Sequence, residues 1–311
     1  MKIAYITQEE CNGVEYHRLL MPLHLTGYDV TRCVGADFSI LNYGFDVVLF
    51  NRSLPVKAQA ALIEDLKDAG TRVIVDVDDY WVMKRDHYLG RHPDNKRYQA
   101  RVMEALSMAD EVWTTHDLLA AKVRPLNANV HVIPNAIDPT EHQWQTKTYY
   151  EQRIGWAGGI THKSDLFLTR GAWGDVEPVI CGAVNNEEWN AIAKQLPCKM
   201  VKGKHVSEYA YLYEEFDIAI APLVDTTFNR HKSNLKILEA GMKGLPIFVQ
   251  DVHPYTDTAT GIHKVTNWTE AIEQAKALSV EQIQEEGQAL REYVLANYDL
   301  REVNKLRMSR L

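Results

Sequence analysis

The chain alternates short apolar runs with longer segments in which apolar residues recur every three or four positions. In the first half the longer segments are 57–70 and 95–110, and their spacing predicts amphipathic helices. Gly70 and Asp110 stand where these helices are expected to end. The short runs are rich in β-branched and aromatic residues, which is typical of buried strands. The predicted strands of this half are 2–7, 45–50, 72–77, 111–115 and 129–134.

The same alternation returns after a polar, proline-containing stretch at 135–152. Strands and helices in this order predict parallel sheets that are covered on both faces. We therefore expect an α/β protein with two Rossmann-like domains facing each other across a cleft. The segment 269–311 is expected to be helical throughout. The second set of predicted strands is 153–159, 177–182, 198–203, 216–223 and 245–250, and the expected division is a domain at 1–140, a linker at 141–152, a domain at 153–285 and helices at 286–311.

Composition narrows the class of protein. The chain has 311 residues, enough for two domains, and its 46% hydrophobic and 24% charged residues are those of a soluble globular protein. The net charge of −8 lowers the expectation of nucleic-acid binding, although a local basic patch stays open. Four widely spaced cysteines indicate free thiols in a reducing cytoplasm. No secretion-signal pattern and no apolar run of about 20 residues is present, so we expect a cytoplasmic protein whose membrane role, if any, is peripheral.

Ligands of such sheets bind at the carboxyl ends of the strands, where four loops of this chain have suitable residues. The first loop, 7–18, contains Gly13, which permits close approach of the backbone, and Arg18. It contains neither a G-x-G-x-x-G nor a Walker A pattern, so we do not expect an NAD or P-loop site. Two readings stay open for this loop: contact with a substrate, or an ordinary connection with a solvated arginine.

The second loop carries Asp76, Asp78 and Asp79 at the end of a predicted strand. Crowded carboxylates are able to bind a divalent ion, to act as a general base or to hold sugar hydroxyls. They also occur as caps of the following segment, and that alternative stays open. The third loop, 155–166, places glycines before Thr161-His162-Lys163, a composition that suits an anion next to a helix start.

The fourth loop leads into a segment with helical periodicity at 233–244. Ser233 or Asn234 is a natural N-cap for this helix. Lys236 and Glu239 are three residues apart, so the simplest interpretation is a surface ion pair worth a few tenths of a kcal/mol. Apolar strands on both sides of the segment favour a different interpretation, in which the helix start faces a ligand.

Several of these stretches carry a resemblance to a known family. The segment "FDIAIAPLVDTTFNRHKSNLKILEAGMKGLPIFVQD" resembles the donor-site signature of GT-B glycosyltransferases, in particular glycosyltransferase family four. "ADEVWTTHDLLAAKV" with "VHVIPNAID" resembles the end of the N-terminal domain in that group, and "IGWAGGITHKSDL" its first C-domain loop. "VIVDVDDYW" is similar to the aspartate-rich strand end of some phage and bacterial members. The resemblance implies a GT-B fold whose last helices cross back to the N-terminal domain.

The resemblance also implies roles for individual residues. Glu239 falls where the family's second glutamate binds the ribose, and Lys163, with His162 as competitor, falls near the basic residue that neutralises the leaving diphosphate. The chain departs from the family at His231, where the first glutamate is expected, and at Trp156, near the usual arginine; Lys232 is expected to compensate. The candidate catalytic residues are Lys163, Lys232, His231 and Asp79; the candidate donor-binding residues are Gly13, Gly158, Gly159, Thr161, His162, Ser233, Lys236 and Glu239; the acceptor-side candidates are Arg18, Asp76 and Asp78.

The activity implied by the resemblance is retaining, metal-independent transfer of a sugar from a nucleotide-sugar, with a UDP-sugar expected as co-substrate and no tightly bound cofactor. A saccharide or glycan precursor is the first expectation for the hydroxyl acceptor. One alternative is a phage-type DNA glycosyltransferase that acts on hydroxymethylated pyrimidine bases, for which the basic stretch 83–101 is the candidate track. Another is a sugar-nucleotide epimerase or an inactive nucleotide-sugar-binding module.

Overall fold

The computed structural model describes residues 1–35, 37–85, 87 and 89–311. The chain forms two compact units, and each contains one six-stranded sheet. The first unit comprises residues 1–136, 231–233 and 300–311, and the second comprises 137–230 and 234–299. Two α/β halves with parallel sheets are confirmed, while the domain limits given above stay predictions.

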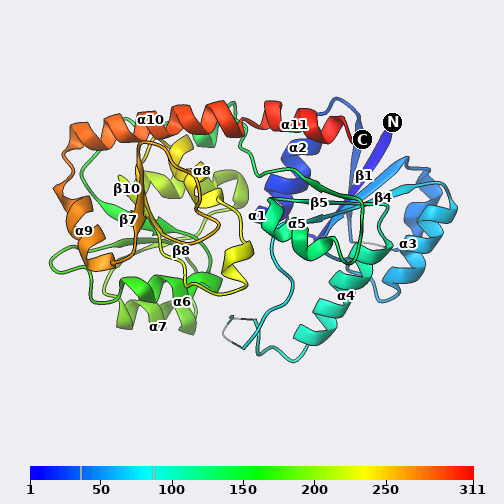
Figure 1. Ribbon diagram of the computed structural model, residues 1–311, viewed down its shortest axis with the longest axis horizontal. Coiled ribbons are helices and arrows are strands. Elements are labelled where there is room, and N and C mark those ends of the chain that lie inside the picture. The colour runs from blue at the N-terminus through cyan, green and yellow to red at the C-terminus, as the bar shows by residue number, and fades with distance from the viewer. Residues whose placement is uncertain (36, 86, 88) are drawn as a thin grey trace. The chain divides into compact units, whose positions relative to one another are not determined.

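The sheet of the first unit has the strand order β2-β1-β3-β4-β5-β6, and all neighbouring strands are parallel. Helices cover both faces, so β3 and β4 are apolar on both sides. The helices α3, α4 and α5 pack on one face, and α2 and α11 pack on the other (Figure 1). The elements are β1 (Lys2–Thr7), α1 (Gly13–Glu15), α2 (Met21–His24), β2 (Asp29–Val34), β3 (Val47–Asn51), α3 (Gln59–Asp68), β4 (Arg72–Val77), α4 (Asn95–Met108), β5 (Glu111–Thr114), α5 (Asp117–Val123), β6 (Val130–Val132) and α11 (Leu300–Met308).

The sheet of the second unit has the order β12-β11-β10-β7-β8-β9 and is also parallel. Apolar residues of α8 and α10 pack in one core cluster, and those of α6, α7 and α9 pack in another. The elements are β7 (Ile154–Ala157), α6 (Lys163–Leu166), β8 (Val179–Ala183), α7 (Glu187–Gln195), β9 (Lys199–Lys202), η6 (Val206–Glu215, a 3₁₀ helix), β10 (Ile218–Ala221), α8 (Leu235–Met242), β11 (Ile247–Gln250), β12 (Ile262–Val265), α9 (Trp268–Ala277) and α10 (Val280–Tyr298).

Helices α8 and α10 approach each other closely because glycines form their contact (Figure 1). A Cβ atom on Gly287 would lie 1.9 Å from the carbonyl oxygen of Gly244, and one on Gly241 would lie 2.7 Å from Val294. Gly244 itself has a φ of 71°, which lets the chain turn from α8 towards β11. These contacts fix the helix on which Lys236 and Glu239 lie.

All ten predicted strands are present; β1 and β4 have the predicted limits, and the limits of the other eight are shifted. The strands β2 and β12 are additional, and the apolar runs did not indicate them. The segment 269–311, expected to be helical throughout, forms the three helices α9, α10 and α11, with short breaks between them. The polar stretch that reads as a linker contains a buried Trp144 and a short 3₁₀ turn at His142–Trp144. Within the described residues, no helix combines the length and the apolar character needed to cross a membrane.

Candidate functional site

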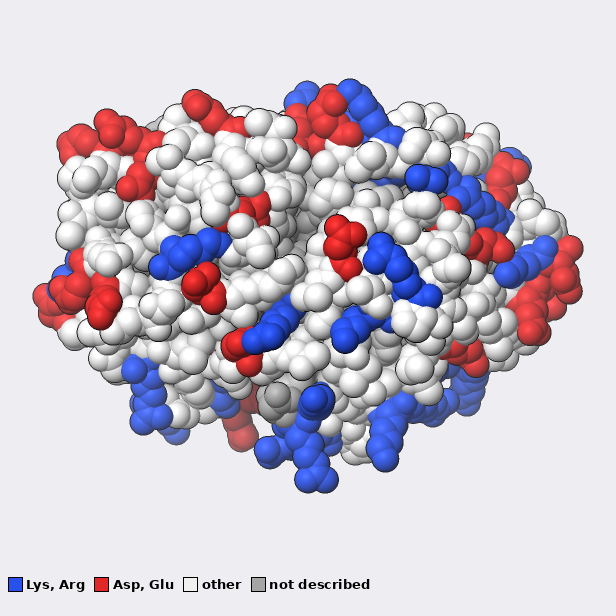
Figure 2. Space-filling model, viewed as in Figure 1, with Lys and Arg blue, Asp and Glu red and all other residues white. Residues whose placement is uncertain are grey.

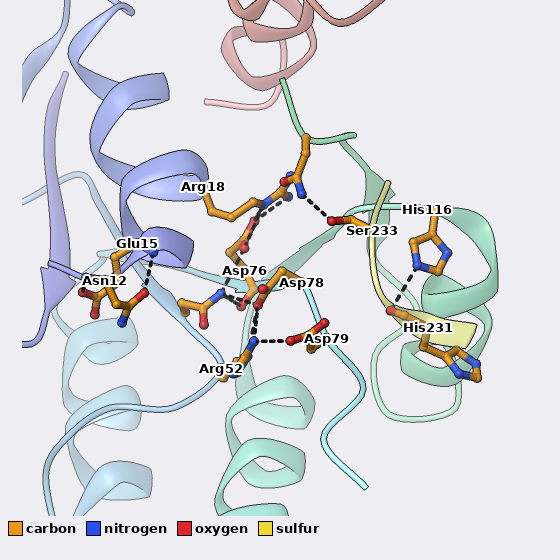
Figure 3. Close-up of polar contacts among 12 residues, drawn as sticks. Asn12, Glu15, Arg18, Arg52, Asp76, Asp78, Asp79, His116, His231 and Ser233 are labelled. Atoms are coloured by element: carbon orange, nitrogen blue, oxygen red, sulfur yellow. Dashed lines mark hydrogen bonds and ion pairs between the residues drawn. The ribbon is translucent and has the colours of Figure 1, made fainter. Parts of the chain in front are cut away.

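The loop after β1 is built by a capping box. Asn12 accepts a hydrogen bond from the N–H of Glu15 at 3.0 Å, and Glu15 accepts in return from the N–H of Asn12 at 3.3 Å. Asn12 and Glu15 face each other in Figure 3. Glu15 also accepts from the N–H of Gln8 at 3.0 Å, so one carboxylate closes the whole loop. Gly13 opens the short helix α1, and a Cβ atom there would meet nothing within 4 Å. The loop therefore leaves open space beside Gly13.

Arg18 and Asp76 form a buried ion pair in the first unit. The Nη2 and Nε groups of Arg18 donate to the carboxylate of Asp76 at 2.7 and 3.1 Å, and the two side chains are 1% and 0% exposed. The Nη1 group donates to the carbonyl of Ile133 at 2.7 Å and to Oδ1 of Asn135 at 3.1 Å. The reading of Arg18 as a solvated side chain is therefore wrong. The assignment of Arg18 and Asp76 to the acceptor side stays a prediction, in which both side chains act from buried positions.

Asp78 and Asp79 are held by a second arginine at the carboxyl end of β4. Nη2 of Arg52 lies 2.8 Å from Asp78 and 3.0 Å from Asp79, and Arg52 has a left-handed φ of 60° (Figure 3). Burial raises the pKa of Asp78, and the attraction of Arg52 offsets this only in part. Asp78 and Asp79 are more accessible than Asp76, with side-chain exposures of 10% and 23%. Of the three carboxylates, these two are therefore the ones able to meet a ligand.

The segment 231–233 belongs to the first unit, although its neighbours in sequence belong to the second. Oγ of Ser233 accepts a hydrogen bond from the amide of Asn135 at 2.7 Å, and Asn135 in turn accepts from Arg18. Nε2 of His116 lies 3.2 Å from the carbonyl oxygen of His231, and because Nδ1 of His116 accepts from the N–H of Leu119, Nε2 is the donor (Figure 3). The candidates Arg18, Asp76 and Ser233 are thus linked through Asn135, whereas the backbone of His231 is held by His116.

In the second unit, glycines mark the ends of adjacent strands. The N–H of Gly158 donates to the carbonyl oxygen of Cys181 at 3.1 Å. Gly182 has a φ of 108°, and a Cβ atom on it would lie only 2.0 Å from the carbonyl oxygen of Gly158. The loops after β7 and β8 can approach this closely only with glycine at position 182. Gly159 has no neighbour within 4 Å of a Cβ position, so the backbone beside it is open.

Lys163 is the first residue of α6 and follows Thr161 and His162 in a 3₁₀ turn. Its side chain is half-buried, and in the described part of the chain it forms neither a hydrogen bond nor an ion pair. Helix α6 has only four residues, so its dipole is weak, and the expected cradle depends on this ammonium group and the loop N–H groups. Thr161 is exposed, and Nδ1 of His162 lies 2.8 Å from Asp165.

Asp165 organises the loops at the carboxyl ends of two neighbouring strands, and the sequence pattern did not indicate it. Its Oδ1 accepts from the N–H of Val224 at 2.9 Å and from the amide of Asn229 at 3.0 Å, while Oδ2 lies against His162. The side chain is 6% exposed. One buried carboxylate therefore ties the loop after β7 to the loop after β10.

Helix α8 begins with Asn234 at its N-cap position, as predicted, but the side chain of Asn234 does not cap the helix. Its amide donates to Asp257 at 2.9 Å, and Asp257 also accepts from Tyr293 and Tyr298. The first N–H groups of α8 consequently receive no side-chain cap, which leaves a partial positive charge at this helix end. Lys232 and Ser233 precede the helix and are not part of it.

The predicted pair of Lys236 and Glu239 is present at 2.8 Å, but it is not the surface pair of the simplest interpretation. The side chains are 17% and 4% exposed, and two tyrosines complete the group. Burial and the charge of Glu239 raise the pKa of Tyr213 and raise that of Tyr209 to about 12. Burial alone lowers the pKa of Lys236, but the carboxylate of Glu239 outweighs it and holds the pKa above its ordinary value. Lys236 therefore stays charged and is occupied by its neighbours.

No group of three or more His, Cys, Asp or Glu side chains within residues 1–35, 37–85, 87 and 89–311 is arranged to hold a metal ion. The carboxylates at the end of β4 are instead neutralised in part by Arg18 and Arg52.

Comparisons with known proteins agree with this architecture. No protein-family model and no curated protein matches the sequence. A trehalose-6-phosphate synthase structure, from a study of glycosyl transfer with retention, is similar with a TM-score of 0.64, 10% identity, and coverage of 100% of this chain and 98% of that chain. The lipopolysaccharide outer core galactosyltransferase WaaB has a TM-score of 0.55, 11% identity, and full coverage of both chains. The chain has the GT-B fold.

Other similar structures have a different activity or a longer chain. A Listeria monocytogenes structure described as a UDP-N-acetylglucosamine 2-epimerase has a TM-score of 0.57 and 11% identity, with coverage of 99% of this chain and 95% of that chain. The chain spans about half, 54%, of TarM, which is similar with a TM-score of 0.57 and 10% identity over 85% of this chain. Since a transferase and an epimerase share this GT-B architecture, the activity must be argued from the site.

Proposed function

We propose that this protein transfers a sugar from a nucleotide-sugar to a hydroxyl acceptor. The observation that carries the proposal is Lys163, a half-buried ammonium group without a partner among the described residues, at the carboxyl end of β7 in a GT-B fold. A cation that is partly desolvated and unpaired is costly to the folded protein unless an anionic ligand completes it. A diphosphate fits this place because the backbone beside Gly159 is open.

The donor is bound mainly by the second unit in this proposal. Lys163, with the N–H groups of the loop at Gly159 and Thr161, holds the diphosphate, and the uncapped start of α8 adds its dipole. The N–H of Gly158 is committed to the carbonyl of Cys181, so Gly158 lines the donor site without donating to the diphosphate. Glu239 accepts hydrogen bonds from the ribose hydroxyls. Each preorganised donor that meets the leaving phosphate contributes about 3–4 kcal/mol to transition-state stabilisation. UDP is the nucleotide we expect, since a TarM structure of this fold contains UDP.

The acceptor side belongs to the first unit. Asp78 and Asp79 receive the acceptor hydroxyls, and Asp79 is the candidate base, while Arg18 and Asp76 support them from the buried layer below. His231 and Lys232 complete the catalytic set and adjoin the start of α8. Front-face attack with retention of configuration is the course that we propose, and it requires no dedicated protein nucleophile. A trehalose-6-phosphate synthase structure of the same fold comes from a study of glycosyl transfer with retention. The whole cycle proceeds without a metal ion in this mechanism.

A saccharide or glycan precursor is the acceptor that we propose. The DNA alternative rests on the loop before α4 and on α4 itself, where Figure 2 shows Lys and Arg side chains gathered on the visible face. Arg101 does not join them, because it donates to the backbone carbonyls of Leu54 and Val56. The exposed members are Lys84, Arg85, Arg91, Lys96 and Arg97.

Epimerisation of a sugar-nucleotide is the second candidate function. It is favoured by His231, which stands in place of the glutamate expected for a transferase, and by the epimerase of the same fold. Incubation of a nucleotide-sugar without an acceptor separates the two: an epimerised nucleotide-sugar would indicate the second candidate, and an unchanged donor that is consumed only with an acceptor would support transfer.

The proposed function is tested by a thermal-shift screen of UDP-, GDP-, ADP- and CMP-sugars followed by turnover measurements. A donor at one hundred times its Kd stabilises the protein by about 2.7 kcal/mol. We expect Lys163→Ala and Lys232→Ala to lower kcat by about a hundredfold with little loss of stability, since each removes a donor to the developing charge. Lys204→Ala, an exposed lysine of the second unit, is the control and should keep the wild-type rate. Wild-type rates in both active-site variants would refute the assignment.

A further inference from the structure

Tyr213 lies in η6 and belongs to the core cluster of the second unit that also contains the apolar residues of α8. Its side chain is buried, and its hydroxyl donates a hydrogen bond of 2.6 Å to Oε2 of Glu239. A hydrogen bond to a carboxylate at this distance is charge-assisted and strong. Nothing in the sequence pattern marks Tyr213 as a site residue, because it lies 26 positions before its partner.

The same carboxylate oxygen has a second donor. Nζ of Lys236 donates to Oε2 of Glu239 at 2.8 Å and to the hydroxyl of Tyr209 at 2.7 Å. Tyr209 thus holds the ammonium group, and the ammonium group holds the carboxylate. Rotation of the Glu239 side chain would break two charge-assisted bonds at once, so its orientation is fixed.

The other carboxylate oxygen, Oε1, is in a different situation. Among the described residues no donor reaches it, and it is not one of the buried polar atoms that lack both solvent and a partner. Glu239 as a whole is nevertheless only 3% exposed. A buried carboxylate with one oxygen fully committed and one still accessible is suited to accept hydrogen bonds from a ligand in a single direction.

We propose that Tyr213 and Lys236 are positioning residues that fix Oε2 of Glu239 so that Oε1 is presented to a ribose hydroxyl pair, and that this makes the site select ribonucleotides over 2′-deoxyribonucleotides. The inference rests on the proposed function, because it assumes that α8 binds the nucleotide of the donor. A 2′-deoxyribose lacks one of the two hydroxyl donors, so the fixed carboxylate forms one hydrogen bond fewer. The binding free energy of the deoxy analogue is weaker because the carboxylate has already lost its hydration.

The selection depends on the rigidity of the carboxylate. In Tyr213→Phe the ring still fills the core next to Phe216, but one of the two bonds to Oε2 is lost. Glu239 then rotates more freely, and nucleotide binding has to order its side chain, which weakens the affinity. Both the affinity for the ribonucleotide and the preference over its deoxy analogue should decrease.

The experiment measures the Kd values of UDP and 2′-deoxy-UDP by calorimetry on the full chain, with the guanosine and adenosine pairs alongside. We expect the wild type to prefer the ribonucleotide by about tenfold or more, equivalent to one good hydrogen bond to a charged group. In Tyr213→Phe, we expect the Kd of UDP to rise about tenfold while that of 2′-deoxy-UDP changes by less than threefold. Tyr211→Phe is the matched control, because Tyr211 lies on the same 3₁₀ helix and its hydroxyl bonds to His142 instead.

The outcomes separate this inference from the proposed function. If the wild type binds none of the three ribonucleotides, the proposed function fails and the inference fails with it. If the wild type binds UDP and Glu239→Gln loses the preference but Tyr213→Phe keeps it, the positioning role is wrong and the donor site stands. Equal weakening of both nucleotides in Tyr213→Phe would indicate a merely structural tyrosine and would also overturn the inference.

Lys236→Met provides an independent variant should Tyr213→Phe fold poorly. It retains the length of the lysine stem and removes the second donor to Oε2. The expected result is again a smaller preference for UDP over 2′-deoxy-UDP. A preference equal to that of the wild type in this variant would overturn the role of Lys236.

Discussion

Two buried arginines in the first unit share one carboxylate. Arg18 pairs with Asp76, while Arg307 on α11 is fully buried, and its Nε and Nη2 groups have no partner in the described residues. Burial first, and then the charge of Arg18, lower the pKa of Arg307 to about 9. The charge of Asp76 acts in the opposite direction and raises the pKa of Arg307, so Asp76 offsets part of the positive charge of both arginines.

This arrangement predicts an unequal cost for removing the two partners of the ion pair. Asp76→Asn should destabilise the protein by about 3–5 kcal/mol, because it leaves two arginines buried near each other without a counter-charge. Arg18→Met should cost less, about 2–3 kcal/mol, since the charge of Arg307 still offsets part of that of Asp76. Urea unfolding of the full chain measures both values.

Lys305→Met is the control for this prediction, because its ion pair with Glu302 is 69% and 67% exposed and should contribute less than about 1 kcal/mol. A larger cost for Arg18→Met than for Asp76→Asn would contradict the shared-carboxylate interpretation.

At the scale of single residues, the sequence indicates candidate site residues, but it does not indicate their hydrogen-bond and ion-pair partners. Glu239, Lys236 and the aspartates after β4 were identified as candidates, yet the pairs that decide their roles join residues 58 and 26 positions apart. No periodicity relates such partners, because they meet only when separate loops gather at one edge of a sheet. Tyr213 and Asp165 were missed for that reason.

Elements with a continuous apolar core were predictable, and the two strands that were missed are of another kind. In β2 no residue is buried, and its sequence DVTRCV contains three polar residues. Strand β12 is short, with the sequence IHKV. Each lies at the edge of its sheet and becomes a strand through pairing with a neighbour, β1 or β11, which is a tertiary effect.

The contact of α8 with α10 allows a test in which two principles predict opposite signs. Helix propensity predicts that Gly287→Ala stabilises α10 by about 1 kcal/mol. The structure predicts destabilisation by about 1–3 kcal/mol or more, because the new Cβ would lie 1.9 Å from the backbone oxygen of Gly244, which cannot rotate away. Thermal unfolding of the variant gives the sign directly.

An exposed position on the same helix calibrates the propensity term. Gln284→Gly is expected to cost about 1 kcal/mol. If Gly287→Ala raises the midpoint of unfolding, α8 and α10 are not packed as described, and the fixed position of Glu239 loses its support.

At the scale of the whole molecule, net charge and local charge point to different acceptors. The formal charge of −8 opposes association with a polyanion, whereas five exposed basic residues near the start of α4 favour it (Figure 2). If about five phosphates were neutralised, the logarithm of the DNA-binding constant would fall with the logarithm of salt concentration with a slope of about −4.5.

For a saccharide acceptor we expect weak DNA binding, with a Kd of about 100 μM or higher near 150 mM salt, as for non-specific contacts. Fluorescence anisotropy of a labelled duplex containing hydroxymethylated cytosine, measured from 50 to 300 mM salt, tests this expectation. The control is a variant of this protein in which five residues are replaced by glutamine: Lys84, Arg85, Arg91, Lys96 and Arg97. These changes remove the basic patch and keep the hydrogen-bonded Arg101. Submicromolar binding by the wild type that is lost in this variant, together with sugar transfer to the duplex, would replace the saccharide with DNA as the acceptor.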